Sequence, residues 1–169
     1  MSFWPGLQII LEYVFESATG IPFVWEDEPI KVMQKPYGVL SLGQSVTVGR
    51  DYSRYTFRDS DTSIDIIGHR ELTINVQIFS RQARGDKSAR ALIEKARLCL
   101  ANPIYRDELR SAGLVFVENH AVTDLNFTFQ NRAENRSTFD VVFRLILQEQ
   151  IVSDNVGFFD SVAISENFT

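Results

Sequence analysis

The sequence predicts an α+β fold: a mainly antiparallel or mixed β-sheet with helices packed on one face, and a long loop or β-arm around residues 50–65. Apolar residues recur at helical spacing near the start of the sequence. Two groups of segments in which apolar and polar residues alternate follow, and a second stretch with helical spacing separates the two groups. This order is typical of a sheet covered by helices on one side. The 169 residues, 44% of them hydrophobic, fit one domain, residues 1–169.

The first helix is predicted at residues 6–19. Pro5 suits the start of a helix and Gly20 its end, and Pro22 prevents the helix from continuing. One side of this segment is polar, so the helix is expected to pack its other side on the core. The apolar side consists of Leu7, Ile10, Leu11, Val14, Phe15 and Ala18.

A second helical segment is predicted at residues 86–101, with Cys99 at the edge of its apolar face. Pro103 stops this helix, and residues 104–113 form a short second helix or turn that Gly113 closes. The apolar face consists of Ala89, Leu92, Ile93, Ala96 and Leu100.

The clearest strand is residues 71–79, where apolar and polar side chains alternate without interruption. The long strand at 138–151 also has Val142 and Ile146 on its second face, so it is either central in the sheet or covered on both faces. The other expected segments are strands at 23–25, 30–34, 37–49 (with a turn or bulge), 114–118 and 123–130, an edge strand at 159–165, an acidic turn at 26–29 and a polar turn at 131–137.

Residues 50–65 interleave aromatic and charged side chains. One interpretation is a platform that stacks the bases of single-stranded nucleic acid. The acidic residues of the segment outnumber its arginines, which favours an exposed loop or β-arm packed on a neighbouring subunit, since tyrosine and arginine are enriched in such contacts. The residues expected at that contact are Tyr52, Arg54, Tyr55 and Phe57.

The charge is unevenly distributed. Residues 81–110 contain eight basic and four acidic side chains, a net charge of +4, so the rest of a chain with net charge -5 carries -9. A solvated helix face is one interpretation. Two unlike patches that orient subunits in an assembly are the other, and the residues expected to contribute are Arg81, Arg84, Lys87 and Arg90. The acidic remainder argues against general nucleic-acid binding and suits a channel wall past which DNA slides.

The chemistry of an enzyme is missing. His69 and His120, each beside a strand or turn, are the available near-neutral acid-base groups, and Cys99 alone excludes thiolate-rich zinc sites. Phosphate-binding and nucleophile-elbow motifs are absent, and Asp59 and Asp61 lie in a stretch typical of solvated turns. The sequence therefore predicts no catalytic residue, no metal, no cofactor and no membrane span.

The later part of the sequence resembles the phage neck-terminator or tail-terminator (tail completion) family. The segments that carry the resemblance are 105–117, 122–129, 131–150 and 158–165. Within them the matching residues are Arg132, Ala133, Glu134, Arg136, Phe139, Asp140 and Phe143. The amphipathic first helix, Trp25 and a strand with Pro36 and Gly38 are compatible with the same family.

The resemblance implies a structural virion protein of the tail or neck, assembled in the host cytoplasm. It implies a homohexameric ring at the head-proximal end of the tail tube, which ends tube polymerisation and docks the neck. The implied partners are other copies of the chain, the tail tube protein, a neck, stopper or head-completion protein, the sheath protein in a contractile tail, and DNA in transit. Arg132, Glu134 and Arg136 are the family-pattern residues expected at a subunit contact.

Two alternatives remain at this point. One is a head-completion or adaptor protein, or a tail-tube or baseplate ring protein. The other, from a different class, is a monomeric binding module or small hydrolase. Self-association separates the classes, because a ring needs one patch of each subunit to meet an unlike patch of the next.

Overall fold

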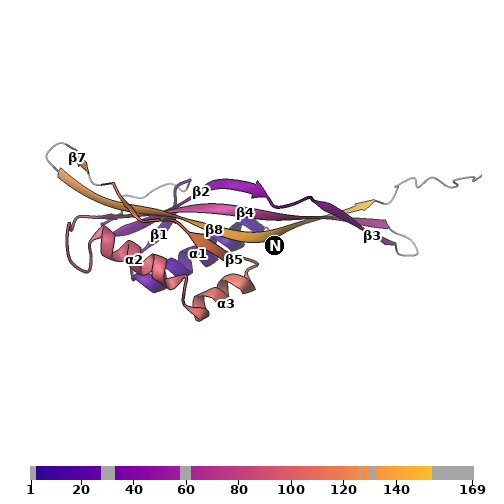
Figure 1. The fold of residues 1–169 in the computed structure, drawn as a ribbon, viewed down its shortest axis with the longest axis horizontal. Helices are drawn as coiled ribbons and strands as arrows, with labels where there is room; N and C mark the ends of the chain where they lie inside the picture. Colours follow the sequence, from indigo (N-terminus) through magenta and orange to yellow (C-terminus); the bar gives the residue numbers. More distant parts are fainter. Residues whose placement is uncertain (1–2, 28–32, 58–61, 126, 130–131, 154–169) are drawn as a thin grey trace, which may run out of the picture.

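The computed structural model describes residues 3–27, 33–57, 62–125, 127–129 and 132–153 (Figure 1). The α+β fold is confirmed. The elements are α1 (Phe3–Thr19), β1 (Phe23–Trp25), β2 (Tyr37–Thr47), β3 (Tyr52–Phe57), β4 (Thr62–Ser80), α2 (Ala89–Cys99), α3 (Pro103–Ser111), β5 (Val115–Asn119), β6 (Thr123–Asp124), β7 (Phe127–Phe129) and β8 (Arg132–Ser153).

The sheet is mixed and mostly antiparallel, with the order β1-β2-β4-β8-β5. Strand β1 is parallel to β2, and β4 pairs with β8 along its whole length, from Thr62 opposite Ser153 to Ser80 opposite Asn135. Strand β3 pairs with the first part of β4, and β6 and β7 pair with the first part of β8. All three helices lie on one face of the sheet, and the β3 end extends beyond them (Figure 1).

Helix α1 packs the predicted face onto the sheet. Leu7, Leu11 and Phe15 are buried, and the helix begins at Phe3, so Pro5 lies in its first turn, where a missing N–H costs nothing. Gly20 follows the helix with a φ of 72°, and its N–H donates to the carbonyl oxygen of Glu16 at 2.8 Å. This left-handed position explains why a glycine ends the helix.

The two long strands bury alternate residues against the helices. On β4 the buried residues are Leu72, Ile74, Val76 and Ile78, and on β8 they are Phe139, Val141, Phe143 and Leu145. The predicted alternation of residues 71–79 is therefore confirmed. Helix α2 covers this surface with its predicted face, and Cys99, expected at the edge of that face, is buried in the core.

The polar turn predicted at residues 131–137 is wrong for the residues that the structure describes, 132–137. Strand β8 begins at Arg132, and Asn135 pairs with Ser80 because β4 continues to that point. Polar side chains can follow one another at the start of β8 because one face of the sheet carries no helix, so the side chains on that face need not be apolar (Figure 1). The strand expected at 123–130 is present as β6 and β7, which pair with β8 in one continuous register.

Of the two alternatives predicted for the long strand, the central position is the one observed. Strand β8 lies between β4 and β5. Ile146 on its second face is 55% exposed, so the described residues do not cover both faces. The bulge predicted in residues 37–49 is confirmed by a register shift between Leu42 and Ser45. The edge strand expected at 159–165 lies outside the described residues, as do residues 30–32 of the strand expected at 30–34, whose Met33 and Gln34 are not in a strand.

Gly38 is required by the close approach of β1 to β2. A Cβ atom at this position would overlap the buried ring of Phe23, which stacks on Phe15.

We expect Gly38→Ala to lower the free energy of unfolding by about 1–3 kcal/mol through overpacking, measured by urea denaturation. Gly6→Ala is the matched control: nothing lies within 4 Å of that site in α1, so alanine should stabilise the protein by up to about 1 kcal/mol. Equal effects at both glycines would contradict this account.

Candidate subunit interface

The predicted interface residues fall into two groups at opposite ends of the β4–β8 ladder. We define the arm as β3 together with residues 62–67 of β4 and 148–153 of β8, and the basic loop as residues 81–87, which follow β4 at its other end. A strand as long as β4, with 19 residues, spans roughly 60 Å at about 3.3 Å per residue. The two groups therefore lie far apart on one chain.

Within the segment 50–65, residues 52–57 pair with the strand that begins at residue 62, so these residues form a β-arm rather than a loop. Tyr52 and Tyr55 are 51% and 53% exposed, and their spacing in β3 places them on opposite faces of the arm. Tyr52 is opposite Ile67 and Tyr55 is opposite Ile64, so both faces carry apolar side chains. Phe57 is opposite Thr62 at the far end. Since the helices do not reach the arm (Figure 1), this ribbon has no core of its own.

Two ion pairs hold β3 onto β4. Arg54 binds Asp65, with Nη2–Oδ2 at 2.8 Å and Nε–Oδ2 at 3.2 Å. Arg70 binds Asp51 through two bonds, of 2.6 Å and 2.7 Å. Asp65 is buried, and the hydrogen bond from Arg54 lowers the pKa of its carboxyl despite the opposing effect of burial. Arg54 thus stabilises the arm internally.

This pair predicts a pH dependence of stability. Because the pKa of Asp65 is lower in the folded protein than in the unfolded chain, its contribution is fully present above the unfolded value of about 3.9 and is lost as pH falls through the folded pKa. We expect Asp65→Asn to be less stable than wild type at neutral pH and the difference to shrink only below about pH 4. Denaturant unfolding at a series of pH values measures this. A difference in unfolding free energy between the two proteins that disappears between pH 6 and 8 would contradict this role of Asp65.

The basic loop is fixed at both ends. The Ser80 hydroxyl donates to the carbonyl oxygen of Lys87 at 2.6 Å and accepts from the Gln82 N–H at 3.0 Å. The Ser88 hydroxyl donates to the carbonyl oxygen of Gly85 at 2.7 Å and also caps α2. All seven residues of the loop are exposed. Within the described residues its cations, Arg81, Arg84 and Lys87, form no ion pair.

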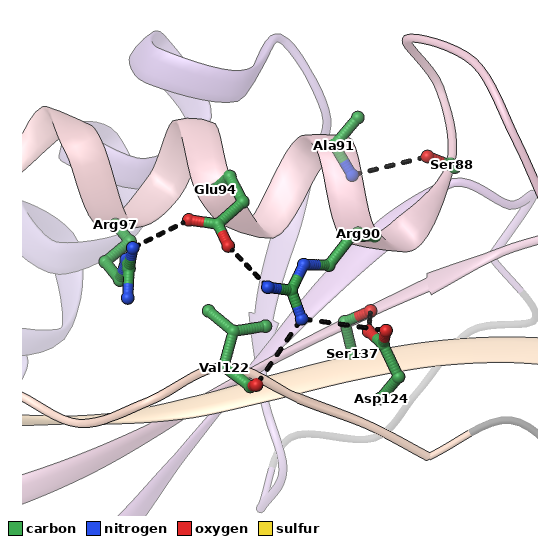
Figure 2. Close-up of polar contacts among 8 residues, drawn as sticks. All are labelled: Ser88, Arg90, Ala91, Glu94, Arg97, Val122, Asp124 and Ser137. Carbon is green, nitrogen blue, oxygen red and sulfur yellow. Dashed lines mark hydrogen bonds and ion pairs between the residues drawn. The ribbon is translucent and has the colours of Figure 1, made fainter.

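Arg90 belongs to a network within the chain. Figure 2 shows its guanidinium between Glu94, at 2.9 Å, and Asp124, at 3.6 Å, with a further bond of 3.4 Å to the carbonyl oxygen of Val122. Glu94 also pairs with Arg97 at 3.1 Å. Arg90 therefore ties α2 to β6, and half of its side-chain surface remains exposed.

Glu134 and Arg136 lie near the basic loop, at the start of β8. Glu134 pairs with Lys35, and the Arg136 guanidinium lies 5.1 Å above the ring of Phe79 and donates to Gln77. These pairings were not foreseen, because they join segments far apart in the sequence. Arg132 begins β8, where it pairs with Phe129.

The reactive groups are few and scattered. Burial raises the pKa of the Cys99 thiol to about 12, so it stays protonated and unreactive. His120 is exposed and lies 3.7 Å from Glu118, and His69 lies on β4 at the base of the arm. No cluster of metal-ligating side chains occurs in the described ranges. Among these same ranges, no helix has the length and apolar character needed to cross a membrane.

Comparison with known proteins matches nearly the whole chain to one family. A family model described as phage neck terminator protein covers residues 7–169. No curated protein matches the chain.

Proposed function

Since the chain belongs to the phage neck terminator protein family, whose members have a structural, non-enzymatic role in the phage tail, we propose that it is a tail terminator acting as a homohexameric ring. The ring occupies the head-proximal end of the tail tube, ends tube polymerisation and docks the neck. Its partners are the tail tube protein, a neck, stopper or head-completion protein and, in a contractile tail, the sheath protein. Residues 1–169 act as one domain, because α1, α2, β4 and β8 share one core.

The observation that carries the ring is the separation of two unlike surfaces. A closed ring requires heterologous contacts, in which a patch on one copy meets a different patch on the next. The arm offers exposed aromatic side chains on a ribbon without a core, and the basic loop offers exposed cations at the other end of β4. Such an arrangement favours head-to-tail association over a two-fold dimer.

The charge on the helix-free face of the sheet is compatible with DNA in transit. Arg144 pairs with Glu71, and Asn75 donates to Asp140 at 2.6 Å, so these groups satisfy one another. The whole chain outside residues 81–110, of which this face is one part, carries a net charge of -9. Since affinity for DNA depends on unpaired cations that neutralise phosphates, this face suits a wall that DNA passes without binding.

The test is electron microscopy of particles from a phage that lacks this protein. A terminator predicts overlong tail tubes, because nothing stops tube polymerisation. Tubes of normal length beside unattached heads would instead indicate a head-completion adaptor and contradict the proposal. Supplying the purified protein to tail tubes should place rings at one end of each tube.

A further inference from the structure

A hollow of about 250 Å³ opens beside β1 on the side that faces the arm. Its lining is Trp25, Glu26, Asp27, Leu40, Ser41 and Leu42. The volume lies below the roughly 300–1,000 Å³ of small-molecule sites, so it suits one or two side chains. Leu42 is 47% exposed, and Glu26 and Asp27 are exposed carboxylates without an ion pair in the described part of the chain.

One buried donor of this hollow has no acceptor. Trp25 is only 1% exposed, and its indole Nε1 is buried without a hydrogen-bond partner among the described residues. Buried tryptophan N–H groups ordinarily find an acceptor, and leaving one unpaired costs free energy. Because this nitrogen has almost no accessible surface, what the hollow offers an incoming segment is its exposed carboxylates, which lack a cation among the described residues.

A peptide segment with a basic side chain supplies this cation. Its ammonium or guanidinium group pairs with carboxylates. The basic loop has this chemistry, with exposed cations that lack ion pairs in the described residues. The bonds from Ser80 and Ser88 restrain the loop near its ends, which reduces the entropy lost on docking.

The loop and the hollow are separate surfaces of the chain. The loop follows Ser80 at one end of β4. The hollow lies where β1 ends at Trp25, while β2 continues alone toward the arm as far as Thr47. Among the described residues no hydrogen bond or ion pair joins the two, and two distinct surfaces on one chain are what a head-to-tail contact between copies requires.

We propose that the basic loop of one copy docks in the Trp25 hollow of the next, with Arg84 or Lys87 against Glu26 and Asp27. The occupant is thus a second copy of this chain. This contact rests on the proposed function and specifies one of the surfaces through which the ring closes.

Charge reversal tests the contact. The loop variant combines Arg84→Glu with Lys87→Glu, and the hollow variant combines Glu26→Lys with Asp27→Lys. Each variant alone places like charges together, so we expect association to need more than about tenfold higher protein concentration in sedimentation velocity. Mixing the two variants pairs each reversed surface with its complement, and the mixture should recover wild-type association in alternating rings of even copy number.

Lys95→Glu is the matched control, because Lys95 is an exposed cation on α2 that lies outside both surfaces and has no ion pair within the described residues. It should associate like wild type. A wild-type chain that never self-associates would contradict the proposed function and the contact together. A wild-type ring that either variant leaves intact, or two defective variants that fail to rescue each other, would overturn the contact alone.

Discussion

Replacing Tyr52, Tyr55 and Phe57 together with serine is expected to convert the proposed ring into monomers without unfolding the subunit. Tyr52 and Tyr55 are about half exposed on a ribbon that lies outside the helical layer, and Phe57 is included on sequence grounds alone. Buried aromatic anchors at subunit contacts contribute about 2 kcal/mol or more each. Losing them should weaken association more than about a hundredfold, measured as mass in solution by sedimentation.

The control for this experiment is Tyr13→Ser. Tyr13 is 51% exposed, like the arm tyrosines, but lies on α1 in the helical layer. It should leave the ring intact if the arm makes the contact. An unchanged oligomer in the arm variant, with normal circular dichroism in both proteins, would show that the arm is dispensable for assembly.

Replacing Phe143 with alanine is expected to lower the free energy of unfolding by about 3–5 kcal/mol. The side chain is fully buried on central strand β8, and its ring meets that of Phe116 edge to face at 6.4 Å. Alanine would leave a cavity where helices and sheet meet. Since domains of this size are stable by only about 5–15 kcal/mol, the loss is a large share of the total.

Ile146→Ala on the same strand is the comparison. Ile146 is 55% exposed on the face without helices, so truncation should change the unfolding free energy of the subunit by less than about 1 kcal/mol. Both values come from urea denaturation of the monomeric arm variant, which separates subunit stability from assembly. Similar losses at the two positions would mean that the helix-free face is also packed.

The sequence predicted those elements whose side chains meet the core. Leu72 to Ile78 alternate because one face of β4 is covered, and α1 and α2 show helical spacing for the same reason. Residues 62–67, the first part of β4, show no such alternation of apolar and polar residues. In the arm the more buried face carries Asp65 and Ile67 and the other carries the half-buried Ile64 and Ile66, so the apolar residues do not mark the inner face.

The interface surfaces were predicted only in part. Aromatic and basic residues mark the arm and the loop in the sequence, and the structure separates them along β4. The hollow was not foreseen, because it depends on Trp25 lying opposite Leu40 in a parallel pair. Local patterns identify strands, but they do not identify which distant strands pair.

The β4–β8 ladder also constrains how the subunit reaches its native state. Thr62 pairs with Ser153 and Ser80 with Asn135, so partners are separated by between about a third and half of the chain's length. Such high contact order is typical of folding in milliseconds to seconds rather than microseconds. While a ribosome is still making residue 131, β4 has no central partner, and the nascent chain exposes its backbone to other nascent copies. Slow expression at low temperature, with chaperones present, should therefore favour soluble subunits over aggregates.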